Sequence, residues 1–143
     1  MNEHGQKAMV SQNRNVQYFK EPTYLLPVTY AQAATYLKQM GYEVYWDDGN
    51  AQLKTFDQWF NDLAKESPDV VVLESTTPVM KFYWKTIDRI KHALPNCIVI
   101  MTGYHSMRKP NETMEQCNAD IVLRSSHIDF ALHRLIPFID END

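Results

Sequence analysis

The chain has 143 residues, of which 44% are hydrophobic and 22% are charged, with a formal net charge of -4. This length allows one domain with a real core, so we expect residues 1–143 to form a single domain. Lys and Arg are scattered rather than striped, which argues against nucleic acid as a partner. No apolar run approaches the roughly 18 residues of a membrane helix, and the first residues lack the apolar core of a signal peptide. We therefore expect a cytoplasmic protein that does not bind membranes.

The amino-terminal part predicts a weak strand, a long connection and a helix. Lys7–Gln12 contains only three apolar residues, Ala8, Met9 and Val10. The connection Asn13–Pro27 is rich in aromatic residues, and long loops of this kind are often functional. Val28–Met40 carries apolar residues at helical spacing and ends at Gly41, a residue typical of helix C-termini.

A second strand and a second helix follow. Glu43–Trp46 reads as a strand and is closed by a turn cluster that begins at Asp47. Thr55 and Gln58 have the spacing of a capping box, which predicts a helix start. The apolar residues that follow recur at helical spacing.

The most informative segment is Pro68–Pro78. Asp69–Leu73 reads as a strand whose aliphatic run is continuous, which predicts burial on both faces of a parallel sheet. It ends abruptly in Glu74, Ser75, Thr76 and Thr77. In open α/β sheets, ligands bind beyond the carboxyl ends of the strands, which is where these hydroxyl groups would lie.

The carboxyl-terminal half continues the alternation of helices and strands. We expect, in order, a helix over Val79–Leu94, a buried strand over Cys97–Met101, a polar loop over Thr102–Ser106, a short helix over Pro110–Gln116, a strand over Asp120–Leu123 and a last helix capped by Ser126. Cys97 and Cys117 lack metal-ligand spacing, and Cys97, which opens a buried strand, is interpreted as an inert core thiol.

This element order predicts an α/β fold: a flavodoxin-like, doubly wound, five-stranded parallel sheet in the order 2-1-3-4-5, with helices on both faces. The loop after Gln12, the segment Glu74–Pro78 and the loop Thr102–Ser106 should then meet at the carboxyl ends of the strands.

A series of short motifs runs through nearly the whole chain in a fixed order. They are Pro27–Leu37, Gly41–Val44, Pro68–Pro78, Ile90-Lys91, Gly103–His105, Pro110–Thr113 and Ala119–Val122. In this order they resemble the cobalamin-binding domain at the amino end of radical S-adenosylmethionine enzymes, nearest the group like the anaerobic magnesium-protoporphyrin IX monomethyl ester cyclase.

The resemblance implies that the corrin is held at the carboxyl ends of the strands. The implied cofactor-binding residues are Asn13, Ser75, Thr76, Thr77, Thr102, Gly103, Tyr104, His105, Ser125 and Ser126. No catalytic residue and no metal ligand is predicted, because the three-cysteine cluster that holds the iron–sulfur centre is absent, as is the Asp-x-His-x-x-Gly motif that supplies a histidine ligand to cobalt in the methionine-synthase type. The iron–sulfur cluster and S-adenosylmethionine would belong to a separate catalytic domain, in cis or in trans.

Each candidate position also has a structural explanation. The hydroxyls of Ser75–Thr77 and of Ser125 and Ser126 can cap helices, Gly103 can permit a tight turn, and His105 can be a solvated loop residue. The aromatic segment Tyr18–Tyr24 can cover the corrin or pack on the domain.

The alternative is a degenerate receiver-like or cobalamin-like domain that serves as a protein-interaction module without cofactor. Glu74 stands where receivers carry the phosphorylated Asp, while Thr102 and Arg124 only loosely imitate the other conserved positions of that family.

Overall fold

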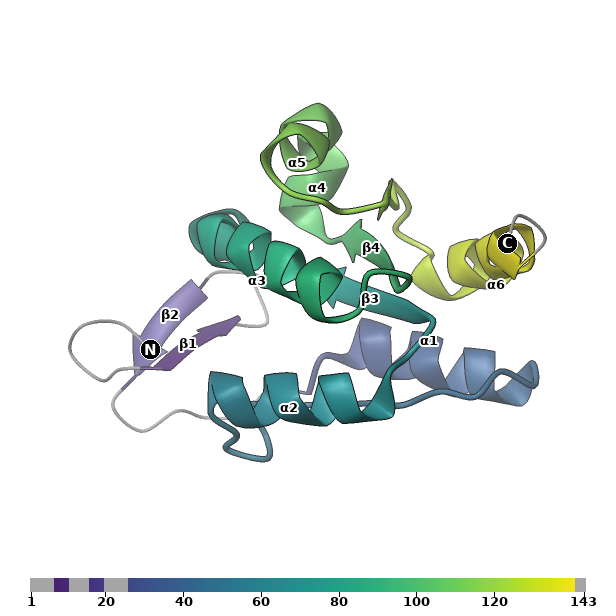
Figure 1. Ribbon diagram of the computed structural model, residues 1–143, viewed down its shortest axis with the longest axis horizontal. Coiled ribbons are helices and arrows are strands. Elements are labelled where there is room, and N and C mark those ends of the chain that lie inside the picture. The colour runs from purple at the N-terminus through teal and green to yellow at the C-terminus, as the bar shows by residue number, and fades with distance from the viewer. Residues whose placement is uncertain (1–6, 11–15, 20–25, 141–143) are drawn as a thin grey trace. The chain divides into compact units, whose positions relative to one another are not determined.

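The computed structural model describes residues 7–10, 16–19 and 26–140 (Figure 1). Contacts divide the chain into two compact units, Met1–Leu25 with Gly49–Arg124, and Leu26–Asp48 with Ser125–Asp143. Each unit is described separately below. In the described part of the chain, no helix has both the length and the apolar character needed to cross a membrane.

The first unit contains a parallel sheet. Its strands are β3 (Val70–Glu74), β4 (Ile98–Thr102) and β5 (Ile121–Val122), in the order β3-β4-β5. Glu74 and Thr102 are register partners at the carboxyl ends of β3 and β4. The prediction of an α/β fold with a parallel sheet is confirmed.

Two helices, α2 (Phe56–Glu66) and α3 (Met80–Ala93), supply the core on one face of this sheet (Figure 1). Val71 and Leu73 of β3 are buried against them, whereas Val70 and Val72 are only half-buried. The prediction of burial on both faces is therefore wrong for β3, because successive side chains point to opposite faces and these helices cover one of them. It holds for most of β4, where Val99, Ile100 and Met101 are fully buried.

The start of α2 follows the predicted capping box. The Gln58 amide N–H donates to Thr55 Oγ1 at 3.2 Å, and the Thr55 amide N–H donates to Gln58 Oε1 at 2.8 Å. From α3, the Arg89 guanidinium lies 4.3 Å from the centre of the Phe60 ring and pairs with Asp57 at 3.3 Å. These contacts hold α2 against α3.

A second polar contact joins α3 to the sheet. Lys91 Nζ donates to the Cys97 carbonyl at 2.9 Å and to both carboxylate oxygens of Asp120 at 3.0 Å. The Asp120 carboxylate also accepts from the Val99 amide at 2.7 Å. One lysine and one aspartate thus tie the end of α3 to the amino ends of β4 and β5.

The amino-terminal strands differ from the prediction. β1 (Lys7–Val10) pairs antiparallel with β2 (Val16–Phe19), a strand that lies inside the expected long connection. The two strands are only five residues apart in sequence, and closing so short a connection costs little entropy. Residues 43–46 do not form the predicted strand, and Glu43, Tyr45 and Trp46 are exposed. The five-stranded order is therefore not confirmed.

The second unit is built on α1 (Val28–Gln39) and α6 (Ile128–Asp140), which pack together. Both helices were predicted, and the chain leaves α1 through Gly41 at a φ of +95°. The Tyr36 ring lies 5.2 Å from the Phe130 ring and 5.7 Å from the His133 ring, so an aromatic cluster joins α1 to α6.

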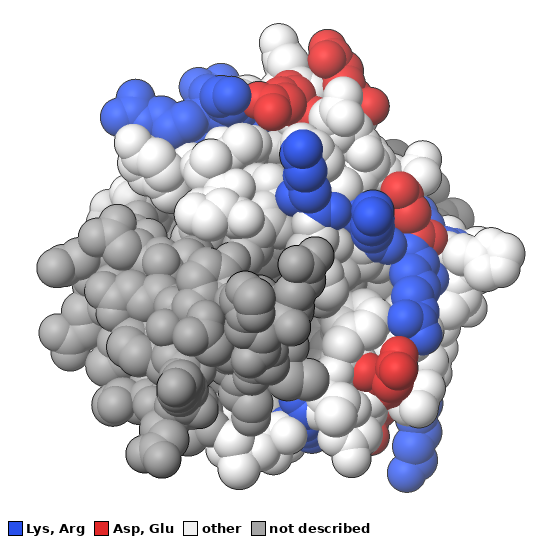
Figure 2. Space-filling model, turned by 90° about the vertical axis from the view of Figure 1, so that its left-hand side faces the viewer, with Lys and Arg blue, Asp and Glu red and all other residues white. Residues whose placement is uncertain are grey.

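Basic and acidic side chains are mixed on the surface. Figure 2 shows Lys and Arg interspersed with Asp and Glu over the described part of the face turned to the viewer. That mixture agrees with the scattered cations of the sequence.

Candidate functional site

The segments that follow β3 and β4 meet at the carboxyl end of the sheet. The Ser75 amide donates to the Thr102 carbonyl at 2.9 Å, which extends the β3–β4 ladder by one bond. Beyond β3 the chain enters the 3-10 helix η1 (Thr77–Val79) and then α3. Beyond β4 it enters α4 (Tyr104–Arg108) and α5 (Pro110–Gln116). The expectation that these two segments share one end of the sheet is confirmed.

Ser75 links the two segments through its side chain. Its hydroxyl donates to the Thr102 carbonyl at 2.8 Å and lies 2.7 Å from the Ser106 hydroxyl. Because the Ser75 proton is used on the carbonyl, Ser106 donates in the second bond. Both serines are fully buried, so this part of the site is satisfied within the protein. Ser106 was not singled out from the sequence, although it closes the predicted Thr102–Ser106 segment.

Gly103 is required by the close approach of Ser75. Its φ is +94°, and a Cβ at this position would lie 2.4 Å from the Ser75 carbonyl oxygen and 2.7 Å from the Ser75 nitrogen. Such a φ with an extended ψ of 174° is essentially restricted to glycine. The tight turn, one of the two explanations given for this glycine, is therefore observed.

His105 is a buried residue rather than the solvated loop residue favoured from the sequence. It lies in the first turn of α4, immediately after the turn at Gly103, and is 4% exposed. Its Nδ1 lies 3.2 Å from Thr77 Oγ1, and its ring meets the Trp84 ring edge-on at 6.5 Å. Burial lowers the pKa of His105; Glu112 opposes this shift and Lys109 adds to it. The imidazole is therefore neutral near pH 7.

Several buried polar atoms at this end of the sheet have no hydrogen-bond partner among the described residues. They are Thr76 Oγ1, Thr102 Oγ1, His105 Nε2 and Trp84 Nε1. Thr76 is 4% exposed and Thr102 is fully buried. Leaving a buried polar group unpaired costs about 1–3 kcal/mol, so each such group calls for a water or ligand partner.

The two threonines share one face of the sheet. Thr102 is the register partner of Glu74, and Thr76 follows Glu74 by two residues in an extended conformation (φ -129°, ψ 149°). Side chains two apart in extended backbone point the same way, so Thr76 and Thr102 lie on the face that bears Glu74. The Glu74 carboxylate also acts on Tyr83: burial, with a smaller contribution from this charge, raises the pKa of Tyr83 to about 12.

Four of the predicted site residues remain: Tyr104, Ser125, Ser126 and Asn13. Tyr104 is 52% exposed, with the Arg108 guanidinium 5.7 Å from its ring centre. Ser125 and Ser126 belong to the second unit. At the start of α6, Ser125 Oγ accepts from the His127 amide at 3.1 Å, whereas Ser126 was the predicted cap. Asn13 lies outside the described residues.

The described residues contain no group of three or more His, Cys, Asp or Glu that could hold a metal ion. Cys97 and Cys117 are free and buried, and burial raises the pKa of both thiols. Buried thiols of this kind are poor nucleophiles, in keeping with the structural role expected for Cys97 from the sequence.

Comparison with known proteins bears on the fold alone. No protein-family model matches the chain, and neither does any curated protein. Among solved structures, a response regulator from Thermotoga maritima matches with a TM-score of 0.57 and 19% identity, over 80% of this chain and 90% of that one. The chain is thus similar in fold to a receiver-like, flavodoxin-like α/β domain.

Proposed function

We propose that this chain is a cobalamin-binding domain that holds the corrin at the carboxyl ends of its strands and serves a radical S-adenosylmethionine catalytic domain, in cis or in trans. The observation that carries the proposal is the set of buried, unpartnered polar atoms of Thr76, Thr102 and His105 at the ends of β3 and β4. A ligand at the carboxyl end of a parallel sheet would supply the missing partners. The ordered motif series from Pro27 to Val122 supports the same ligand.

Within this proposal the chain binds and orients the cofactor, and the reaction belongs to the partner domain. The Thr76 and Thr102 hydroxyls donate to polar groups of the cofactor's nucleotide tail, and the neutral His105 ring offers Nε2 to the same region. When bound, cobalamin supplies a redox-active cobalt, for which no protein ligand is predicted here. In the loaded domain the sheet is five-stranded in the predicted order 2-1-3-4-5, in which residues 43–46 are strand 2, residues 7–12 are strand 1, and β3, β4 and β5 follow. Its expected location is the cytoplasm.

A second candidate is a degenerate receiver-like module that binds a protein and no cofactor. The response-regulator fold and the internal pairing of Ser75 with Ser106 favour it. Glu74 ends β3, Thr102 ends β4, and Arg124 follows β5 by two residues. Because the Glu74 side chain is one methylene longer than Asp, an acyl phosphate at this position is not part of the candidate function.

Retention of cobalamin separates the two candidates. The protein is incubated with hydroxocobalamin at tens of micromolar and desalted, and the visible absorbance of the protein fraction is measured. The proposal predicts near-stoichiometric retention by the unmodified chain. The absence of corrin absorbance from a folded protein would leave the interaction module as the function.

Isosteric variants test which hydroxyls take part. Thr76→Val and Thr102→Val each remove an unpaired buried hydroxyl, so the apo protein should keep or gain stability while cobalamin binds more weakly. One hydrogen bond nets about 0.5–1.5 kcal/mol, which predicts a two- to tenfold loss of affinity for each variant. Thr86→Val is the matched control, because Thr86 is equally buried but bonds within α3, to the Phe82 carbonyl.

A further inference from the structure

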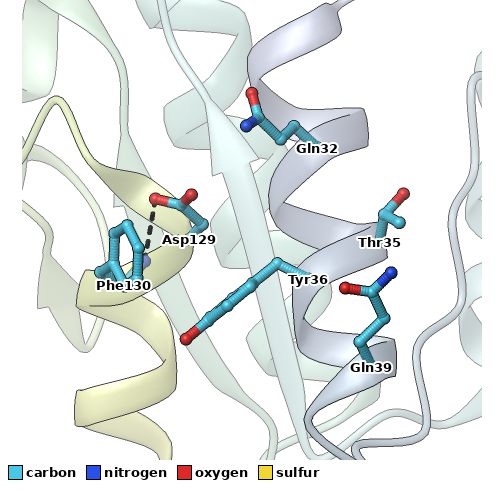
Figure 3. A pocket seen from close by; sticks show the side chains of 6 residues that line it. All are labelled: Gln32, Thr35, Tyr36, Gln39, Asp129 and Phe130. Atoms are coloured by element: carbon cyan, nitrogen blue, oxygen red, sulfur yellow. Dashed lines mark hydrogen bonds between the residues drawn. The ribbon is translucent and has the colours of Figure 1, made fainter.

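A groove lies between α1 and α6 in the second unit. Figure 3 shows its lining, which consists of Gln32, Thr35, Tyr36 and Gln39 from α1 and Asp129 and Phe130 from α6. Its volume is about 450 Å³, within the range of small-ligand and side-chain sites. The motif series and the fold comparison assign it no role.

The α6 side of the groove contributes the Asp129 carboxylate and the Phe130 ring, which lies next to Tyr36 of α1. Asp129 is the only formally charged residue of the lining. Its Oδ1 accepts from the Phe130 amide at 2.9 Å, and no Lys or Arg among the described residues pairs with it. Phe130 is 55% exposed, and its ring is tilted by 59° to that of Tyr36 at 5.2 Å. A half-buried carboxylate beside the exposed Phe130 ring suits a flat cation.

The α1 side is uncharged and rich in hydrogen-bonding groups. Gln32, Thr35 and Gln39 are all exposed, and the Thr35 hydroxyl donates to the Ala31 carbonyl at 2.8 Å. The only charged residue in α1 is Lys38, which does not line the groove. Primary amides both donate and accept, so Gln32 and Gln39 can bond to the main chain of an incoming segment.

We propose that this groove is a protein-docking site that receives an arginine side chain of a partner. The guanidinium pairs with the Asp129 carboxylate and stacks on the Phe130 and Tyr36 rings, while the α1 amides bond to the flanking peptide groups. Arginine suits the site better than lysine, because its planar guanidinium can form two parallel hydrogen bonds to a carboxylate and can also stack on an aromatic face. The net charge of -4 favours a basic partner, and the proposal does not depend on cofactor binding.

The test uses the full chain, labelled with ¹⁵N, and the peptide acetyl-Gly-Arg-Gly-amide, with the citrulline peptide as its neutral isostere. Amide shifts are recorded during titration to millimolar peptide. We expect saturable shifts confined to residues 32–39 and 128–133, with at least fivefold weaker binding of the citrulline peptide. Equal binding of the two peptides, shifts elsewhere in the chain or no saturable shift would overturn the proposal.

Matched variants show whether the named side chains are responsible. Asp129→Asn keeps an acceptor for the Phe130 amide but removes the charge, and Phe130→Leu removes the ring. Each variant should weaken binding of the arginine peptide severalfold, while its spectrum remains that of the folded chain. Glu115→Gln, an exposed position in α5 with the same change of charge, should have no effect. An equal loss in Glu115→Gln would show that net charge, and not this groove, attracts the peptide.

Discussion

At the scale of single residues, Gly103 allows the turn after β4 to lie directly against Ser75, the residue that follows β3. Both its positive φ and the lack of room for a Cβ against Ser75 exclude other residues. We predict that Gly103→Ala lowers the free energy of unfolding by at least about 3 kcal/mol. Urea denaturation measures this loss.

Gly41 provides the control for that substitution. It has a similar φ of +95°, yet a Cβ there would meet nothing within 4 Å. Gly41→Ala should therefore cost only the backbone penalty of about 1–2 kcal/mol. If the two variants lose the same stability, the close approach of Ser75 to Gly103 has no energetic weight.

His105 makes stability depend on pH. Its pKa is lowered in the folded state, mainly by burial, so the unfolded chain binds the proton more tightly. The stabilising contribution is complete above the unfolded pKa of about 6.5 and is lost as pH falls below it. We predict that the urea midpoint decreases when the pH is lowered from about 7.5 to about 5.5, which is about one unit on either side of that pKa. The decrease should be smaller in His105→Gln. The exposed His92, changed to Gln, should leave the profile as it is; an unchanged profile in His105→Gln would contradict the assignment.

Sequence reasoning at this scale succeeded where the signal is local. Thr55 and Gln58 lie three residues apart and form the capping box that their spacing predicts. The burial of His105 was not predictable in the same way, because it depends on Thr77 and Trp84, which are remote in sequence. The unpaired Thr76 and Thr102 hydroxyls likewise become visible only when β3 and β4 lie side by side.

At the scale of elements, Asp120 connects α3, β4 and β5. Removal of its carboxylate in Asp120→Ala leaves both Lys91 Nζ and the Val99 amide short of a partner. We predict a loss of about 2 kcal/mol in the free energy of unfolding, discounted for partial exposure. Asp120→Asn retains an acceptor for the Val99 amide and should lose only about 1 kcal/mol. Equal losses would mean that the hydrogen bond to the Val99 amide contributes nothing.

The strong elements were predictable and the weak ones were not. β3, β4, α1, α2, α3, α5 and α6 follow from long aliphatic runs or helical periodicity and lie within a few residues of their predicted bounds. Lys7–Val10 and residues 43–46 are too short for periodicity to decide their partners. Neither the hairpin of β1 with β2 nor the short helix α4 was predicted.

At the scale of the whole molecule, the proposed five-stranded order makes a testable claim about the outer edge of β3. Among the described residues β3 pairs only with β4, and its aliphatic edge carries none of the Lys or Pro residues that protect natural edge strands. If another strand pairs there, every amide from Val71 to Glu74 should be protected from hydrogen exchange. Alternating fast and slow amides, measured by NMR, would instead show an open edge and contradict the order 2-1-3-4-5.

The most direct test of the central claim is hydrogen–deuterium exchange of the chain with and without hydroxocobalamin, followed by mass spectrometry. The proposal predicts slower exchange, on addition of cobalamin, in peptides that cover residues 74–79 and 102–106. The same peptides should lose that protection in the Thr76→Val, Thr102→Val double variant, while exchange in α2 stays unchanged. Unaltered exchange at saturating cobalamin, or protection confined to other segments, would contradict cobalamin binding at the strand ends.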